Sequence, residues 1–244
     1  IRYWSVTGVQ TCALPIYQLF LRRVPNGAAP DRYDGAEGVM AATVHLHQGD
    51  LPSGLDLGPA VAIDTETMGL RPERDRLCVV QLSSGDGTAH CVRFAKASYD
   101  APNLKRLLAD AKTLKILHFA RFDVAMCAKY LGVRMAPVYC TKIASRLVRT
   151  FTDRHGLKDL CRDLIGRELS KEQQSSDWGA SDLTQAQLNY AAADVLYLHA
   201  IKARLDEMLA REGRTHLAQA CFDFLGTRAD LDLLGWGDED IFAH

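Results

Sequence analysis

Short apolar runs separated by turn residues mark the region after the first forty residues. Three runs rich in β-branched and apolar side chains, at 61–64, 77–82 and 89–94, are separated by turns that contain Gly, Pro and Asp. This pattern predicts a three-stranded antiparallel meander. His45 and His47 alternate with apolar residues just before it, which is typical of an edge strand with surface histidines, and metal binding there is a less favoured alternative.

Further along the chain, strand and helix patterns alternate. Strands are predicted at 114–117 and 138–140, and helices at 103–109, 120–131, 141–148 and 157–164. The longest helix is predicted over about 184–209, with an apolar stripe that includes Leu188, Val195 and Leu205 and with Asp182 or Thr184 as its cap. A meander followed by β-α-β-α units predicts an α/β fold in which helices flank a mixed sheet.

Composition fits an ordinary globular protein. Of the 244 residues, 48% are hydrophobic and 24% are charged, and the net charge of −1 provides no global positive field for nucleic acid. The seven cysteines include no Cys-x-x-Cys pair, which argues against a zinc cage and favours a reducing cytoplasm. No apolar stretch reaches the ~18 residues of a membrane span.

The segment 1–39 differs from the remainder. It shows little periodicity and ends in a stretch rich in Gly, Ala, Pro and Asp. We expect a non-native or disordered extension there, with a natural N-terminal arm as the alternative. Met40 is then a plausible natural start, and 40–244 is predicted to be one domain with a C-terminal helical tail.

Four acidic residues lie where apolar elements end or begin: Asp64, Glu66, Asp123 and Asp194. Asp64 and Glu66 are two positions apart at a strand end, so both point to one face of the sheet. Carboxylates gathered there repel one another unless a cation neutralises them, and all-oxygen ligands suit Mg²⁺ or Mn²⁺ better than zinc. Two divalent cations would serve phosphodiester cleavage. The alternative is a set of solvated acids at strand ends.

Tyr190 strengthens the metal hypothesis. It precedes Asp194 by four residues, so both lie on one face of the predicted helix, and the three alanines between them leave room for close approach. A phenol at this spacing can hold or deprotonate a water beside a metal-bound carboxylate. The alternative is a core tyrosine beside a surface aspartate. Asp123 begins a helix after the strand at 114–117, where an anion is also favoured for structural reasons.

The order Asp-Thr-Glu at 64–66, His-x-x-x-Phe-Asp at 118–123 and Tyr-x-x-x-Asp at 190–194 resembles the three motifs of the DEDD 3′–5′ exonucleases. The motif-three tyrosine indicates the subgroup that carries it. Ser-Asp-Trp-Gly at 176–179 and the segment that follows at 183–198 are similar to ribonuclease D in particular. Three motifs in order are a much more specific signal than any one of them.

The resemblance covers roughly residues 61–209 and departs from the family twice. Motif two often carries an asparagine after its histidine, whereas Phe119 stands here, so any polar contact from that position is lost. Ribonuclease D enzymes that process tRNA carry helical nucleic-acid-binding domains after the catalytic one, whereas only a short segment follows Leu209. The chain therefore resembles short, single-domain members of the family.

The resemblance implies a ribonuclease H-like fold and a two-metal mechanism. Asp64, Glu66 and Asp194 would ligate one Mg²⁺ or Mn²⁺ ion, and Asp64 would bridge to a second ion held by Asp123 directly or through water. Tyr190 would orient or deprotonate the attacking water. The substrate would be the 3′ end of single-stranded RNA or DNA, and the product a nucleoside 5′-monophosphate.

Candidate substrate contacts come from residues near these motifs: Thr65, Met68, His118, Phe119, Phe122, Arg154, Lys158 and Trp178. Phe119 and Phe122 offer stacking surfaces to a terminal base or pack in the core. Arg154 and Lys158 flank the start of the helix at Leu157, where a helix N-terminus and cations can hold a phosphate, or they belong to a solvated basic face. Trp178 either stacks on a base or packs in the core. For His118 the alternative is a structural role.

Two other functions remain as alternatives. The strand followed by Asp-Thr-Glu is superficially similar to the nucleophile loop of haloacid dehalogenase-type phosphatases, although those use Asp-x-Asp and Glu66 holds the second place here. The second alternative is a catalytically silent nucleic-acid-binding or scaffold protein on an exonuclease fold. A binding module has no need of a repulsive carboxylate cluster, which favours the enzyme.

Overall fold

The computed structural model describes residues 42–95, 98–170, 173 and 175–243. Six strands in this part form one mixed sheet in the order β1-β4-β3-β2-β5-β6. The strands are β1 (Thr43–Gln48), β2 (Ala60–Thr67), β3 (Leu77–Ser83), β4 (Thr88–Arg93), β5 (Leu114–Leu117) and β6 (Val138–Cys140). β2, β3 and β4 pair antiparallel, whereas β1, β5 and β6 each join a neighbour in parallel. The predicted meander and both later strands are confirmed.

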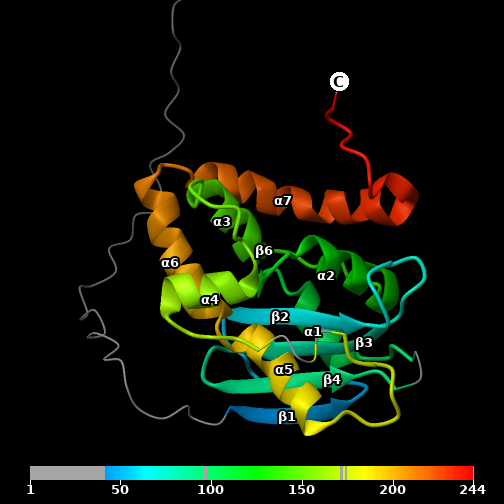
Figure 1. Ribbon diagram of the computed structural model, residues 1–244. Coiled ribbons are helices and arrows are strands. Elements are labelled where there is room, and N and C mark those ends of the chain that lie inside the picture. The colour runs from blue at the N-terminus through cyan, green and yellow to red at the C-terminus, as the bar shows by residue number, and fades with distance from the viewer. Residues whose placement is uncertain (1–41, 96–97, 171–172, 174, 244) are drawn as a thin grey trace, which may run out of the picture. The chain divides into compact units, whose positions relative to one another are not determined.

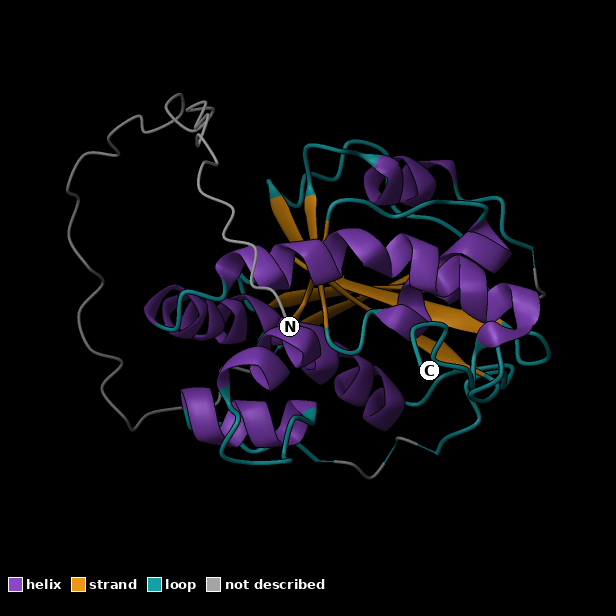
Figure 2. Cartoon of the chain, turned by 90° about the horizontal axis from the view of Figure 1, so that it is seen from above, coloured by secondary structure: helices purple, strands orange, loops and turns teal. Residues whose placement is uncertain are grey.

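Helices lie on both sides of the sheet (Figure 2). They are α1 (Pro102–Ala109), α2 (Arg121–Met126), α3 (Thr141–Val148), α4 (Leu157–Ile165), α5 (Gln185–Leu196), α6 (Leu198–Arg211) and α7 (Thr215–Leu231), with π-helical turns η1 (Cys127–Leu131) and η2 (Asp232–Trp236). α5 lies across the meander (Figure 1) and packs on β1, β2, β3 and β4, whereas α6 contacts β5 and α7 contacts β6. The predicted mixed sheet flanked by helices is therefore confirmed.

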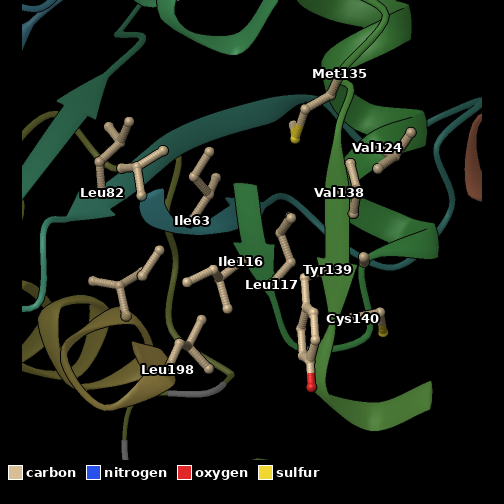
Figure 3. Packing of buried hydrophobic residues seen from close by; sticks show 14 of the residues in the cluster. Ile63, Leu82, Ile116, Leu117, Val124, Met135, Val138, Tyr139, Cys140 and Leu198 are labelled. Atoms are coloured by element: carbon tan, nitrogen blue, oxygen red, sulfur yellow. The ribbon is translucent and has the colours of Figure 1, made fainter. Parts of the chain in front are cut away.

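The hydrophobic core lies between the sheet and its helices. Ile63, Leu82 and Ile116 come from three different strands and pack toward Leu198 at the start of α6 (Figure 3). All four side chains are fully or almost fully buried. β3 is buried along its whole length, as expected for a strand covered on both faces. The core thus fixes the position of β2, which carries the first acidic motif.

The prediction of one continuous helix over 184–209 is wrong, because two helices, α5 and α6, occupy these residues. The chain bends at Tyr197 (φ −103°, ψ −4°), so that α5 crosses the strands while α6 turns away to pack on α3 and α4. The longest helix in the described part is instead α7, with 17 residues. Thr184 is the cap, since its hydroxyl accepts from the backbone N–H of Gln187 and the Gln187 side chain accepts in return.

The C-terminal segment docks on its own domain. α7 packs on α2, α3 and β6, and Arg121 at the start of α2 forms an ion pair with Asp232 in which Nε and Oδ2 are 2.6 Å apart. Arg121 also donates to the carbonyl of Gly237. Among the described helices, none has both the length and the apolar character to span a bilayer. Residues 1–39, predicted to be an extension, lie outside the described residues, so that prediction and the boundary at Met40 stay predictions.

Candidate active site

β2 presents the first two carboxylates from a rigid strand. Val61, Ala62 and Ile63 are fully buried and lead directly into Asp64, which pairs across the ladder with Gln81 of β3. Gln81 is a buried polar residue in an otherwise apolar stretch, and its Nε2 donates to Asp64 Oδ2 at 3.2 Å. Glu66 follows two residues later on the same face of the strand. The sheet therefore fixes the spacing of Asp64 and Glu66.

α5 brings the third carboxylate to the same place. Oxygen atoms of Asp64, Glu66 and Asp194 all lie within 4.8 Å of one another, and these side chains are half-buried. Ala191 and Ala192 are buried, so the helix approaches the sheet closely at this point. Residues from two elements distant in sequence thus converge, which the motifs had predicted.

Asp123 enters from α2 and sits beside this group. Its side chain is 3% exposed, and the Thr65 hydroxyl donates to its Oδ1 at 2.6 Å. Burial raises the pKa of Asp64 most, and the negative charge of Asp123 raises it further. Asp123 is not a member of the three-residue group within 4.8 Å. The structure therefore gathers three acids tightly and holds the fourth next to them through Thr65.

The four carboxylates of the cluster need a positive counter-charge in order to ionise together. Burial, followed by the neighbouring carboxylates, raises the pKa of Glu66 to about 9 and that of Asp64 well above its ordinary value. Burial likewise raises the pKa of Asp123 and of Asp194 to about 7. None of the ion pairs in the described part involves any of these four acids. An all-oxygen donor set that lacks a protein counter-charge fits hard divalent cations.

Tyr190 lies against the cluster on α5. Burial, followed by the charges of Asp194, Glu66 and Asp64, raises the pKa of its phenol. A hydrogen bond from Tyr190 lowers the pKa of Asp194 and partly opposes the effect of burial. The ring packs near Trp178, with 6.2 Å between ring centroids. The phenol therefore stands beside the carboxylates, as the four-residue spacing had predicted.

The motif-two residues have distinct environments. His118 is partly buried, and its Nδ1 is 2.9 Å from the Thr141 hydroxyl, which agrees with a structural role. Phe119 adopts a left-handed backbone conformation with φ of 63°, its ring is 47% exposed, and the Lys142 ammonium lies 4.2 Å from the ring centroid. Phe122 is partly buried and packs on the core. Only Phe119 of these three presents a large free surface.

The remaining candidates lie around the segment that precedes α5. Trp178 is 3% exposed and belongs to a small core cluster with Cys78 and Cys91, so its ring packs in the interior here. Met68 is 50% exposed, yet it approaches Gly179 so closely that an added Cβ would lie 2.3 Å from its sulfur. Thr65 is buried, and its hydroxyl donates a hydrogen bond to Asp123.

The two basic candidates lie near the start of α4. Arg154 is exposed, and Lys158 in the first turn of α4 is partly buried. Arg149, which is 2% exposed, forms an ion pair with Asp163 and donates to the Arg154 carbonyl, so it supports this loop. Sequence reasoning missed two supporting residues. Gln81 was detectable as one polar side chain inside an apolar strand, whereas Arg93, which donates to the Ala180 and Ser181 carbonyls, carried no such signal.

A family model described as a 3′-5′ exonuclease matches residues 50–210. The chain therefore belongs to the 3′–5′ exonuclease family. Ribonuclease D of Granulibacter bethesdensis is 37% identical over 156 residues, which cover 64% of this chain and 39% of that protein. The chain thus spans well under half the length of the ribonuclease D proteins that it matches.

Solved structures give a fuller match. Brucella melitensis NrnC is similar with a TM-score of 0.81 and 57% identity, over 83% of this chain and 98% of that chain. Further structures of the Brucella protein hold Mg²⁺ or pGG. Ribonuclease D of Escherichia coli is more distant, with a TM-score of 0.60 and 27% identity over 70% of this chain and 45% of that one.

These findings confirm the family, the ribonuclease H-like fold and the enzyme class that the motifs predicted. The cofactor class, a divalent cation, is confirmed by the family assignment together with the acidic group. The assignment leaves the phosphatase alternative without support.

Proposed function

We propose that this protein is a metal-dependent exonuclease that shortens single-stranded RNA from the 3′ end and releases nucleoside 5′-monophosphates, with DNA as a second substrate. The observation that carries the proposal is the convergence of Asp64, Glu66 and Asp194 within 4.8 Å, with Tyr190 beside them. A catalytically silent binding protein would have no reason to keep this repulsive group together.

The residues fit two divalent cations. Asp64, Glu66 and Asp194 would hold one, and Asp64 together with Asp123 would hold the other. Support comes from the raised pKa values of these acids, since a cation that favours their charged forms would relieve the mutual repulsion. When bound, two such ions polarise the scissile phosphate, acidify the attacking water and stabilise the leaving 3′ oxygen.

Tyr190 would position the attacking water. Burial is the largest cause of its raised pKa, and this cause persists when cations neutralise the neighbouring carboxylates. The phenol therefore stays protonated near neutral pH and acts by hydrogen bonding, which favours the orienting role over that of a general base. Thr65 would act through Asp123, because its hydroxyl fixes the orientation of that carboxylate.

A hollow of about 760 Å³ that Phe119 helps to line is proposed to hold the nucleic acid. Among its lining residues are Lys142 and Arg146 of α3 and Phe224 of α7. No ion pair in the described part neutralises Lys142 or Arg146. Exposed aromatic rings beside free cations suit bases and phosphates of a flexible strand.

The similar Brucella protein is seen with pGG, so we include short 5′-phosphorylated RNA, down to a dinucleotide, among the proposed substrates. A cytoplasmic location stays a prediction that accords with this substrate class. The six cysteines described by the structure, Cys78, Cys91, Cys127, Cys140, Cys161 and Cys221, are all free, as expected in a reducing compartment.

The proposal is tested with 5′-labelled RNA and DNA of matched sequence, from dinucleotides upward, in Mg²⁺, in Mn²⁺ and in chelator. We expect a ladder shortened from the 3′ end that requires metal and that Asp64→Asn abolishes. Tyr190→Phe should lower kcat by at least about 100-fold with little change in KM. The matched control is Glu168→Gln, because Glu168 is an exposed acid after α4. Metal-independent cleavage, or full activity in Asp64→Asn, would refute the proposal.

A further inference from the structure

Three histidines gather on one face of the sheet edge, away from the acidic motifs. His45 and His47 are two residues apart on β1, the edge strand, and His90 lies on the neighbouring strand β4 in register with His45. Because side chains alternate along a strand, all three rings point to one face. The ring centroid of His90 lies 5.1 Å from that of His45 and 5.3 Å from that of His47.

Two of these rings already point nitrogen atoms at each other. His47 Nε2 and His90 Nδ1 are 3.0 Å apart, so one nitrogen donates and the other accepts through a lone pair. A cation that replaced the shared proton could take a lone pair from each ring, once both rings rotate so that the two lone pairs converge on a point beside the line that joins the nitrogens. Asp86 lies close enough to His90 for its negative charge to act on the imidazole, which adds an electrostatic attraction for cations.

We propose that His47 and His90 form a second metal site, one for a borderline transition-metal dication such as Ni²⁺ or Cu²⁺, with water in the remaining positions; His45 lies beside this pair and outside the ligand set. Imidazole nitrogen is a preferred ligand of these ions and a poor one for Mg²⁺. The site is therefore chemically distinct from the all-oxygen group at Asp64.

The separation of the two nitrogens indicates the geometry. With metal–nitrogen bonds of about 2.0–2.1 Å, an N···N separation of 3.0 Å corresponds to an angle of about 94° at the metal. Square-planar and octahedral ions place neighbouring ligands at about 90°, whereas a tetrahedral ion needs the two nitrogens about 3.3 Å apart. By this separation alone, Ni²⁺ and Cu²⁺ match the pair more nearly than Zn²⁺ does.

The surroundings allow entry and keep the rings in the ligating form. His45 is exposed, and His47 and His90 are half-buried, so the pair is reachable from solvent. Partial burial and the nearby imidazoles lower the pKa of both His47 and His90, and a neutral imidazole is the form that binds metal. Binding would tie the edge strand β1 to β4, which gives a readout that does not depend on nuclease activity.

The test is calorimetric titration of the tag-free full chain with NiCl₂ alone as the probe, in excess Mg²⁺ to occupy the acidic cluster. We expect one Ni²⁺ per chain, weakened at least about tenfold by His47→Gln and by His90→Gln. The control His216→Gln, at an exposed histidine of α7, should bind as the parent does. Ni²⁺ should also raise the Tm of the parent and of the control more than that of the two variants.

A measurement on the parent protein guards against variants that fold poorly. Cu²⁺ added at one equivalent in excess Mg²⁺ should give an electron paramagnetic resonance spectrum with coupling to at least two nitrogens. Oxygen-only coordination in that spectrum would overturn the proposal, as would Ni²⁺ binding that both variants retain at full strength. Neither result would affect the exonuclease proposal, which concerns other residues.

Discussion

Replacing Glu66 by Gln should stabilise the metal-free protein, and the gain should grow with pH. Glu66 has an ordinary pKa of 4.5 that rises to about 9 in the fold. Between these values the folded protein keeps a proton that the unfolded chain releases. The free energy of unfolding of the parent therefore falls as pH rises through this window. Gln removes that dependence at this position because it carries no charge.

The magnitude follows from the pKa shift. Each pH unit inside the window is worth about 1.4 kcal/mol, so the step from pH 5 to pH 8 amounts to at most about 4 kcal/mol. Coupling among the carboxylates spreads part of this over Asp64 and Asp194, since each residue responds when another loses its charge. We therefore expect the variant to exceed the parent by about 2–4 kcal/mol at pH 8 and by less than about 1 kcal/mol at pH 5.

The measurement is urea unfolding of parent and variant in chelator at pH 5, 6, 7 and 8. The control is Glu168→Gln, at an exposed position, whose difference from the parent should stay small at every pH. A Glu66→Gln protein that is less stable than the parent at pH 8, or a difference that does not change with pH, would refute the view that repulsion and burial raise the free energy of this carboxylate.

Three further outcomes are expected. Mg²⁺ should raise the Tm of the parent in proportion to the logarithm of its concentration, and Asp64→Asn should lose most of that rise; an equal rise in both would contradict the ligand assignment. Thr65→Val should lower stability by about 1–2 kcal/mol and activity at least tenfold, because Asp123 loses its hydroxyl donor; unchanged activity would exclude a positioning role. Arg93→Met should make the segment 180–181 more sensitive to protease, measured by mass spectrometry of the fragments, because its carbonyls lose their donor.

The main elements of the sheet could be predicted from local patterns. The runs at 61–64, 77–82 and 89–94 became β2, β3 and β4, because short runs rich in β-branched and apolar residues and bounded by turn residues favour strands. The break at Tyr197 could not be predicted, since the apolar stripe continues through it. Helix periodicity does not record where a helix must turn to pack on two different surfaces.

The candidate site was likewise predictable from the sequence only in part. Asp64, Glu66, Tyr190 and Asp194 were identifiable from spacing alone, because strand and helix periods place residues two or four apart on one face. Asp123 was identified from its place at the start of a helix after a strand, and the resemblance to a family implied its role as a metal ligand. For Trp178 the sequence left stacking on a base and packing in the core open, because its motif carried no information on which way the ring faces; the ring is buried in a small core cluster.

By itself the sequence determined the residue types, their order and the local periods, and these were enough to indicate oxygen ligands for divalent cations on an α/β fold. Only the tertiary structure decided that β2, α2 and α5 meet, that Gln81 and Thr65 hold the carboxylates, and that His47 and His90 face each other across β1 and β4. The physical reason is that distances between segments remote in sequence depend on how side chains of the whole core pack, and no local pattern encodes that packing.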